Sequence, residues 1–216
     1  MAKKVRLTRP ELKRKRDALA RFTRYLPMLK LKQQQLQMTV LEVRQHRRQA
    51  QAEADETREQ IAPYRRLLRD TAGVNVEGLA EPEEVTTGTE NVAGVRIPVF
   101  EAVSFAPADY SLFGTPPWVD RMLADLRELA RREAKVKVLT EQHELLNAAL
   151  TKIIQRVNLF EKVLIPEARE AIRVIRIALG EEQTAAVGRA KLAKAKLRRQ
   201  PQQVLAIDVP DEEGAG

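Results

Sequence analysis

Residues 146–157 read LNAALTKIIQRV, in which Leu146, Leu150, Ile153 and Val157 stand four, three and four positions apart. Alternating spacings of three and four place one apolar side chain per turn on a single helix face, which is the seam pattern of a coiled coil. The pattern continues in both directions along the second half of the chain. Its further members are Met122, Leu126, Leu129, Val136, Leu139, Phe160, Leu164, Ala168, Ile172, Ile175 and Leu179. We therefore predict a long helix over residues 118–200.

The first half of the chain carries a matching seam and predicts a helix within residues 1–72. Its members are Leu12, Leu19, Phe22, Leu26, Leu29, Leu36, Val40, Val43, Ala50, Ala54, Ile61, Tyr64 and Leu68. Thr8, followed by Pro10 and Glu11, is typical of a helix start. We expect kinks or local breaks at Pro27 and Pro63, and another departure where Pro166 meets an eleven-residue phase. The predicted fold is mostly α, a long antiparallel two-helix coiled coil.

The insert between the helices, residues 73–117, is rich in Gly and Pro and cannot be one helix. Gly73 suits the end of the first helix. Residues 91–105 are rich in Val, Ile and Phe, with a Gly placed for a turn, so we predict a small β-hairpin. For four of its apolar residues we expect one of two roles: packing within the hairpin itself, or docking on a companion subunit. These are Val95, Ile97, Val99 and Phe100.

The second helix is predicted to be longer than its partner. Aligning the two helices from the insert brings the start of the first close to Glu182, so residues 183–199 have nothing to pair with. They are rich in Ala, Lys and Arg, which favour helix, but a lone helix of this length is marginal in water. We expect this overhang to sit in a socket formed by another protein. Residues 201–216 are predicted to be a flexible tail on one elongated domain.

Composition narrows the possible classes. The chain has 216 residues, no Cys and a net charge of +8. Residues 1–72 contain 19 basic and 8 acidic residues, a net +11, whereas residues 73–117 contain 1 basic and 7 acidic residues, a net −6. A basic shaft with an acidic insert predicts different partners at different places. No long apolar run or signal-like start occurs, so we predict a cytoplasmic protein with no membrane span.

The sequence contains no recognisable catalytic, cofactor or metal motif. His46 and His143 are the only histidines, and no carboxylate cluster or phosphate-binding Gly motif accompanies them. We expect structural or solvent-facing roles for both. A basic nucleic-acid-binding helical protein is an alternative that the charge allows, but no aromatic residues interleave with the basic clusters. A generic coiled-coil spacer is the other alternative.

Three segments together resemble the D-subunit family of rotary V-type and A-type ATPases. They are LTRPELK at residues 7–13, ENVAGVRIPVFE at residues 90–101, and VLIP at residues 163–166 continuing to IRVIR at residues 172–176. With the order helix, insert, helix, the resemblance covers most of the chain. The middle segment is the most specific part of it, because coiled-coil residues alone fit many spacers.

The resemblance implies a central rotor shaft, analogous to the gamma subunit of F-type synthases. It implies that both chain ends lie inside a ring of catalytic and regulatory subunits. The insert end then faces a small companion stalk subunit and a membrane-side rotor adaptor, at the inner face of the membrane. Such a shaft carries torque but is not itself an ATPase, and it needs no cofactor. Proton or sodium coupling, and synthesis or hydrolysis, stay open because other subunits decide them.

A rotating shaft must avoid deep side-chain interlock, so small Ala and flexible basic side chains suit its tip. We therefore expect shallow electrostatic contacts between eight basic residues and acidic loops of the ring. The eight are Lys13, Arg14, Arg16, Lys191, Lys194, Lys196, Arg198 and Arg199. The alternative is that these charges only keep the helices in solution.

Overall fold

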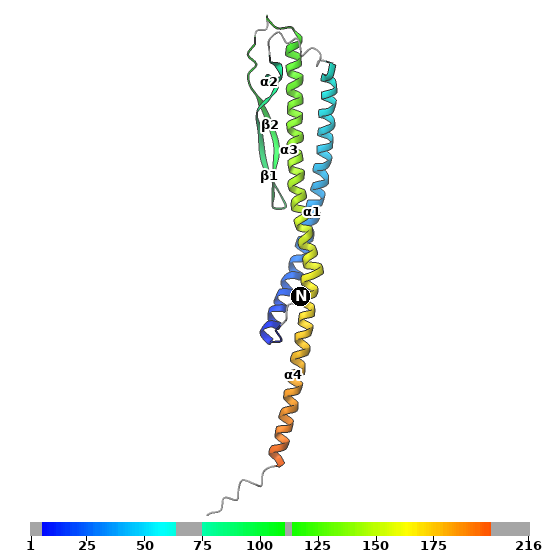
Figure 1. Ribbon diagram of the computed structural model, residues 1–216, viewed down its shortest axis with the longest axis vertical. Helices are drawn as coiled ribbons and strands as arrows, with labels where there is room; N and C mark the ends of the chain where they lie inside the picture. Colours follow the sequence, from blue (N-terminus) through cyan, green and yellow to red (C-terminus); the bar gives the residue numbers. More distant parts are fainter. Residues whose placement is uncertain (1–5, 64–74, 111–113, 200–216) are drawn as a thin grey trace, which may run out of the picture. The chain divides into compact units, whose positions relative to one another are not determined.

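The computed structural model describes residues 6–63, 75–110 and 114–199. Its elements are α1 (Arg9–Ile61), α2 (Val76–Ala80), β1 (Pro82–Val92), β2 (Val95–Phe105), α3 (Trp118–Asn158), the π-helical turn η2 (Leu159–Leu164) and α4 (Ile165–Arg199) (Figure 1). The mostly helical fold with a hairpin between long helices is confirmed. Predictions for Tyr64, Leu68, Gly73 and the tail at residues 201–216 fall outside the described residues.

The chain forms two compact units, which we describe separately. Unit 1 comprises Met1–Arg24 and Phe160–Gly216, and unit 2 comprises Tyr25–Leu159.

Helix α1 begins where the sequence predicts. The Leu12 amide donates a hydrogen bond of 3.0 Å to the carbonyl of Thr8. The expected break at Pro27 is absent, because α1 continues through it. Pro27 is exposed, as is Thr23 one turn earlier, so the carbonyl that loses its helical partner is at the solvent face. Near Pro63, in contrast, α1 has already ended, at Ile61.

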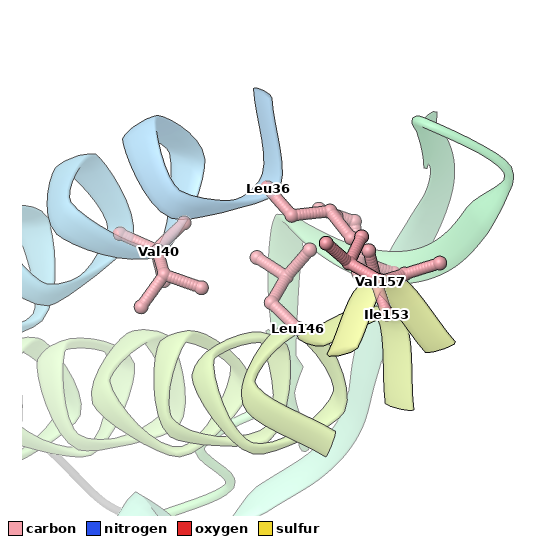
Figure 2. Close-up of a cluster of buried hydrophobic side chains, with 7 residues drawn as sticks. Leu36, Val40, Leu146, Ile153 and Val157 are labelled. Carbon is pink, nitrogen blue, oxygen red and sulfur yellow. The ribbon is translucent and has the colours of Figure 1, made fainter. Parts of the chain in front are cut away.

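The core of unit 2 is built from α1, α3 and β2 (Figure 2). Leu36 and Val40 of α1 point toward Leu146 of α3, with Ile153 and Val157 close by. The remaining members of this cluster are Val43 and Ile97. Leu36 and Leu146 are fully buried. The seam therefore holds α1 against α3 as predicted, and β2 adds a third contributor that the seam pattern did not include.

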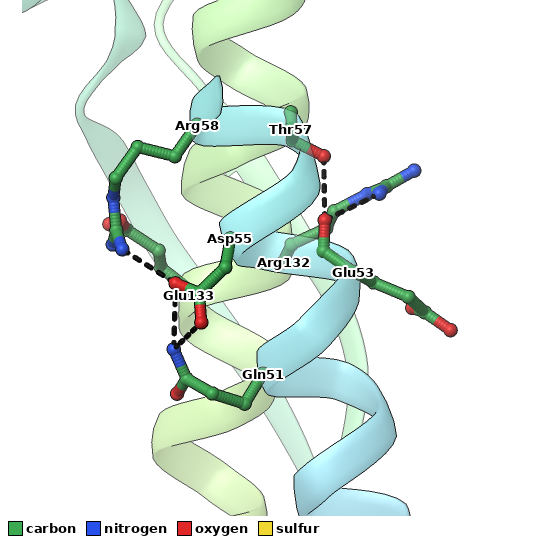
Figure 3. Close-up of polar contacts among 7 residues, drawn as sticks. All are labelled: Gln51, Glu53, Asp55, Thr57, Arg58, Arg132 and Glu133. Atoms are coloured by element: carbon green, nitrogen blue, oxygen red, sulfur yellow. Dashed lines mark hydrogen bonds and ion pairs between the residues drawn. The ribbon is translucent and has the colours of Figure 1, made fainter. Parts of the chain in front are cut away.

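Polar contacts also join α1 to α3 (Figure 3). The Arg58 guanidinium lies 2.7 Å from a Glu133 carboxylate oxygen, and Arg132 donates to the Glu53 carbonyl at 2.9 Å. Arg58 also pairs with Asp55 of its own helix at 2.7 Å. Hydrogen bonding to Glu133 is the main reason that the pKa of Arg58 is raised. These contacts are exposed, so each is expected to contribute little to stability.

The hairpin is longer than predicted. Its turn is Ala93-Gly94, with φ of 50° and 79°, which matches the left-handed conformation that tight two-residue hairpins require. The first strand begins at Pro82 rather than near Asn91, because the Val and Thr residues before Gly88 also favour strand. The two strands pair antiparallel with irregularities between Pro82 and Glu84 and between Thr86 and Thr87.

The hairpin lies along α3 rather than standing apart from it (Figure 1). In β2, Ile97 is buried and Val95, Val99, Val103 and Phe105 are half-buried, whereas Glu101 is exposed. Gln142 of α3 is buried and its amide donates to the Pro98 carbonyl. This hydrogen bond satisfies an otherwise costly buried amide. The insert is therefore anchored on the body of unit 2.

The base of the insert is held on the start of α3. Val76 and Ala80 of α2 are buried with Val119 and Met122 of α3. Arg127 of α3 donates to two insert carbonyls, those of Leu79 at 3.2 Å and Ala106 at 2.5 Å, and lies 5.3 Å from the centre of the Phe105 ring. A single arginine thus ties the two ends of the hairpin to one helix.

Unit 1 contains the start of α1, most of η2 and all of α4. Phe22 and Phe160 form an edge-to-face ring pair with centroids 5.3 Å apart. Three of the buried residues of α4, Ala168, Ile172 and Ile175, belong to the predicted seam. Ile165 and Ala171 are buried as well, whereas the predicted seam residues Leu164 and Leu179 are only half-buried. A departure from α geometry does occur beside Pro166, as the π-helical turn η2; the straightening or kink expected at Pro166 stays a prediction. From Gly180 to Arg198 every residue of α4 is exposed.

Candidate partner-binding surfaces

The first basic cluster lies on the opening turns of α1. Lys13, Arg14 and Arg16 are all exposed. Arg14 lies 3.8 Å from the carboxylate of Glu11, which Lys15 also approaches to 4.0 Å. Glu11 thus partly neutralises Arg14, whereas Lys13 and Arg16 are in no ion pair with a described residue. These two are the cations of the cluster that remain available for a partner.

Lys13 and Arg16 border an open groove between α1 and α4 within unit 1. The groove has a volume of about 620 Å³. It is lined by Arg9, Leu12, Lys13, Arg16, Asp17, Arg176, Leu179, Gly180 and Gln183. Four cations against one carboxylate make this groove electropositive. Leu12 and Leu179 are its apolar side chains.

A second groove in unit 1 shares two arginines with the first. It has a volume of about 390 Å³ and is lined by Arg16, Leu19, Arg169, Ile172, Arg173 and Arg176. Its three α4 arginines, Arg169, Arg173 and Arg176, were not among the residues predicted from sequence. Their signal was present, because spacings of four and three place Arg169, Arg173 and Arg176 on one side of α4, beside the buried seam.

One of these arginines is committed to its own helix. Arg173 donates to both carboxylate oxygens of Glu170, at 2.9 and 2.7 Å. The hydrogen bond lowers the pKa of Glu170 and raises that of Arg173, so both groups stay charged. Arg169 and Arg176 have no such partner among the described residues. The groove therefore presents Arg16, Arg169 and Arg176 as its available cations.

The second predicted cluster occupies the free end of α4. Lys191, Lys194, Lys196 and Arg198 are exposed there, and the side chain of Arg199 falls outside the described residues. None of the four described side chains lines the groove beside the first cluster; α4 contributes Arg176, Leu179, Gly180 and Gln183 to that groove instead. Val187, Leu192 and Leu197 are exposed on the same segment. The end of α4 is thus a single helix with basic and apolar side chains open to a partner.

The predicted hairpin residues differ in accessibility. Ile97 is only 3% exposed and belongs to the α1–α3 core cluster, and Val95 packs against that cluster. Val99 and Phe100 are half-buried. Ile97 is therefore accounted for by packing within the chain. Partner contact through Val95, Val99 and Phe100 stays a prediction.

Neither histidine belongs to a cluster able to do chemistry. His46 is exposed, whereas His143 is half-buried and its ring contacts the Asn147 amide at 3.1 Å. Burial, with Arg47 and Arg44 nearby, lowers the pKa of His143. Across the described ranges, no group of three or more His, Asp or Glu residues is placed to hold a metal ion. None of the described helices is both long and apolar enough to cross a bilayer.

Comparison with known proteins gives a consistent result. The family of the ATP synthase D subunit matches residues 11–195. The V-type ATP synthase D subunit of Borreliella burgdorferi is 37% identical over 194 residues, covering 90% of this chain and 95% of the relative. Proteins of the same name from Chlamydia pneumoniae and Chlamydia felis are each 34% identical, over 91% and 94% of this chain and 95% and 98% of their own lengths. The chain belongs to the family of ATP synthase D subunits.

Proposed function

We propose that this chain is the central rotor shaft of a V-type ATP synthase. It carries torque between nucleotide sites in a surrounding ring and an ion rotor in the membrane that moves protons or sodium ions. The observation that carries this proposal is the exposed end of α4. Residues 180–198 form helix and are exposed throughout, with none buried against the rest of the described chain, although the family match continues to residue 195.

An exposed helix of this length needs help to persist. In proteins, most of the stability of a helix comes from packing of its apolar face rather than from local propensity. Ala and Lys/Arg supply local propensity, but no seam stabilises the segment. A surrounding sleeve of other subunits supplies the missing environment. The sleeve also explains why the apolar side chains Val187, Leu192 and Leu197 are outward-facing.

The side chains of unit 1 suit a shaft that turns inside such a sleeve. Long Lys and Arg side chains follow a moving acidic partner without a deep energy minimum, because exposed ion pairs contribute only about 0.2–1 kcal/mol each. We propose that the eight predicted basic residues, with Arg169 and Arg176 of the groove, make these contacts with acidic loops of the ring. Many weak contacts hold the shaft centred without stopping it at one angle.

The chain itself has no catalytic part in this proposal. Hydrolysis or synthesis of ATP takes place in the ring of catalytic and regulatory subunits. The insert end faces the small companion stalk subunit and the membrane-side rotor adaptor. The assembly is cytoplasmic and peripheral at the inner face of the membrane. Neither the spacer nor the nucleic-acid binder accounts for a family match along nearly the whole chain.

Native mass spectrometry of the complex isolated in mild detergent tests the proposal. We expect one copy of this chain with two larger subunits in three copies each, and nucleotide hydrolysis by the complex. Recovery of the chain by itself, or with nucleic acid, would contradict the shaft role. Duplex binding by the same preparation, measured at two salt concentrations, tests the nucleic-acid alternative, because electrostatic binding to nucleic acid weakens steeply as the salt concentration rises.

A further inference from the structure

The exposed end of α4 combines basic and apolar side chains and has no acidic ones. Residues 183–199, which we call the α4 tip, contain six Lys or Arg residues and no Asp or Glu. Val187, Leu192 and Leu197 of the tip are 55, 68 and 74% exposed. An open recess of about 410 Å³ lies on the same segment, lined by Gln183, Thr184, Val187, Gly188 and Lys191. The tip therefore presents a positively charged surface with apolar side chains.

The residues that follow the tip have the complementary composition. Residues 200–216, which we call the acidic segment, contain no Lys or Arg and four carboxylates, at Asp208, Asp211, Glu212 and Glu213. They also contain four larger apolar residues, which are Val204, Leu205, Ile207 and Val209. Opposite charges and matching apolar residues favour contact between two surfaces. Because tip and segment belong to one chain, their effective concentration is on the order of millimolar, so even weak contacts form.

The length of the acidic segment matches the distances along α4. At 1.5 Å per residue, Val187 lies about 18 Å and Arg176 about 35 Å from the end of the helix at Arg199. An extended chain covers at most about 3.3–3.6 Å per residue, so Leu205 reaches about 20 Å from Arg199 and Asp211 about 40 Å. When the segment doubles back on α4, its apolar residues therefore reach the apolar residues of the tip. Its carboxylates reach the level of Arg176.

The groove of unit 1 supplies the positive charge at that level. It includes Arg176 and Gln183 of α4, and its lining has four cations and one carboxylate. Residues 211–213 are three consecutive acidic residues, so they bring three negative charges to one place. Each exposed ion pair is weak and screened by salt, but several act together. A whole second copy of the chain fits this surface less well, because its net charge is also +8.

We infer that the acidic segment folds back along α4, with its apolar residues on the tip and its carboxylates in the groove of unit 1. The occupant of this surface in the isolated chain is thus a segment of the chain itself. A sleeve that surrounds the tip has to displace the segment, so the segment acts as a removable cover of the unassembled shaft. Only this displacement rests on the proposed function; the contact within the chain does not.

Amide hydrogen exchange of the isolated full chain tests the contact. The segment variant combines Asp208→Asn, Asp211→Asn, Glu212→Gln and Glu213→Gln. Loss of the cover should speed exchange over residues 183–198 at least fivefold, because an uncovered helix opens more often. The matched control makes the same change of net charge at four exposed residues of the insert, by combining Glu81→Gln, Glu83→Gln, Glu84→Gln and Glu90→Gln. It should alter exchange of the same amides less than twofold.

A charge exchange tests whether segment and groove meet directly. The groove variant combines Lys13→Glu, Arg16→Glu and Arg176→Glu, all at exposed positions, and should also speed exchange in the tip at least fivefold. Adding Asp211→Lys, Glu212→Lys and Glu213→Lys should bring exchange back to within twofold of the parent, because the attraction returns with the signs reversed. A groove variant that had merely lost its fold would not be rescued by changes in the segment.

Carbodiimide cross-linking identifies the occupant of the groove. The reagent joins a Lys amine to a carboxylate beside it, so mass spectrometry should find a link between Lys13 and residues 208–213. An equal mixture of isotopically heavy and light chains shows whether each link lies within one chain. Links that join heavy to light chains would assign the groove to a second copy and overturn the inference.

Association with the purified ring tests the displacement. The segment variant should associate at least threefold faster than the parent and the insert control, because no cover has to leave first. An unchanged rate would overturn the displacement step.

Two exchange results would overturn the contact itself. One is equal exchange in the parent and the segment variant, and the other is an equal effect of the segment variant and its insert control. If the ring binds the parent but exchange shows no cover, this inference fails and the proposed function stands. If exchange shows the cover but no ring binds, the contact within the chain stands and the proposed function fails.

Discussion

At the scale of single residues, α3 serves two neighbours from adjacent positions. Leu146 is fully buried in the cluster that joins α1 to α3, and Gln142, one turn earlier, donates to the Pro98 carbonyl of β2. The same helix therefore holds both the seam and the hairpin. Substitutions along α3 are expected to have large effects at both kinds of position, and small effects where the side chain faces water.

Ile153 measures the strength of the seam. It is 5% exposed and belongs to the α1–α3 cluster. Ile153→Ala removes buried methyl groups and leaves a cavity, so the free energy of unfolding should fall by about 2–5 kcal/mol. Leu145→Ala, at an exposed position of the same helix, is the control and should cost less than about 1 kcal/mol. Urea unfolding compares the two. Equal stability of both variants would mean that the seam does not hold the helices.

His143 gives unit 2 a dependence on pH. Its pKa in the folded chain is lowered from 6.5 by burial and by Arg47 and Arg44. Well above pH 6.5 the ring is neutral in both states. As the pH falls below 6.5, the unfolded chain takes up the proton first, so stability decreases until the lowered folded-state pKa is passed.

The variant His143→Gln removes this contribution while keeping a polar neighbour for Asn147. Thermal melts at a series of pH values from neutral to about pH 5 should therefore show a smaller loss of stability in the variant than in the parent. His46→Gln is the control, because His46 is exposed. Parallel pH curves for His143→Gln and the parent would show that the lowered pKa has no effect on folding.

The sequence predicted the buried seam residues of α3 but missed its second face. Ala134, Val138 and Gln142 are buried at spacings of four that lead into Leu146. A small residue such as Ala134 or a polar one such as Gln142 does not by itself indicate a buried face. No local feature of the sequence predicts that the hairpin packs along α3. Gln142 in particular reads as a solvent-facing residue until the Pro98 carbonyl is placed beside it.

At the scale of elements, α4 combines a packed half with an unpacked half. Gly180 and Gly188 lie in the helix, and an added Cβ at either position meets no atom within 4 Å. Gly lowers helix stability by about 0.5–1 kcal/mol relative to Ala. Both glycines therefore weaken a segment in which every described side chain is exposed. They make the free end of α4 easier to bend or fray.

The double variant Gly180→Ala with Gly188→Ala should stabilise the end of α4. We expect slower amide hydrogen exchange over residues 181–198 and more helical circular dichroism in the isolated chain, with no change in the amides of β2. Ala185→Gly with Ala190→Gly provides the opposite control, because it should speed exchange in the same segment. If the double Ala variant exchanged as fast as the parent, helix propensity would not limit the order of this segment.

The elements were predicted more reliably than their boundaries. Seam periodicity and the Gly/Pro-rich insert defined the order helix, hairpin, helix, because these signals are local. The start of β1 at Pro82 was missed, since pairing with β2 extends the strand beyond its own apolar pattern. The sequence also did not predict that Leu159–Leu164 would be π-helical, because a π-helical turn of six residues leaves the spacing of the apolar residues almost unaltered.

At the scale of the whole molecule, the shaft role depends on the placement of the basic residues as well as on the fold. Changing the eight predicted basic residues together to Gln should weaken association with the ring and flatten its salt dependence, whereas any single change should have little effect. The residues are Lys13, Arg14, Arg16, Lys191, Lys194, Lys196, Arg198 and Arg199. Titration of the assembled ring with each variant, at two salt concentrations, measures both quantities.

A control separates sleeve contact from general solubility. Lys135, Lys137, Lys152 and Arg156 are exposed cations of α3, so changing these four to Gln alters the net charge by the same amount as changing Lys191, Lys194, Lys196 and Arg198. Only the α4 set should weaken the interaction with the ring. Equal losses in both sets would show that net charge, and not the position of the cations, governs association.

The candidate surfaces were only partly visible in the sequence. Closely spaced Lys and Arg residues are visible directly in the sequence, so both basic clusters were predicted. The arginines at residues 169, 173 and 176 were missed because they alternate with seam residues, and the groove they line exists only once α1 lies beside α4.

Rotation of this chain inside its ring is the central claim, and a single labelled position tests it. The sequence has no Cys, so Thr86→Cys on the exposed face of β1 creates one site for a probe in this chain. With the ring fixed to a surface, ATP should drive the probe around in one direction with three stops per turn. A probe that stays still while the complex hydrolyses ATP would contradict the shaft role, because the chain would then belong to the stationary part of the machine.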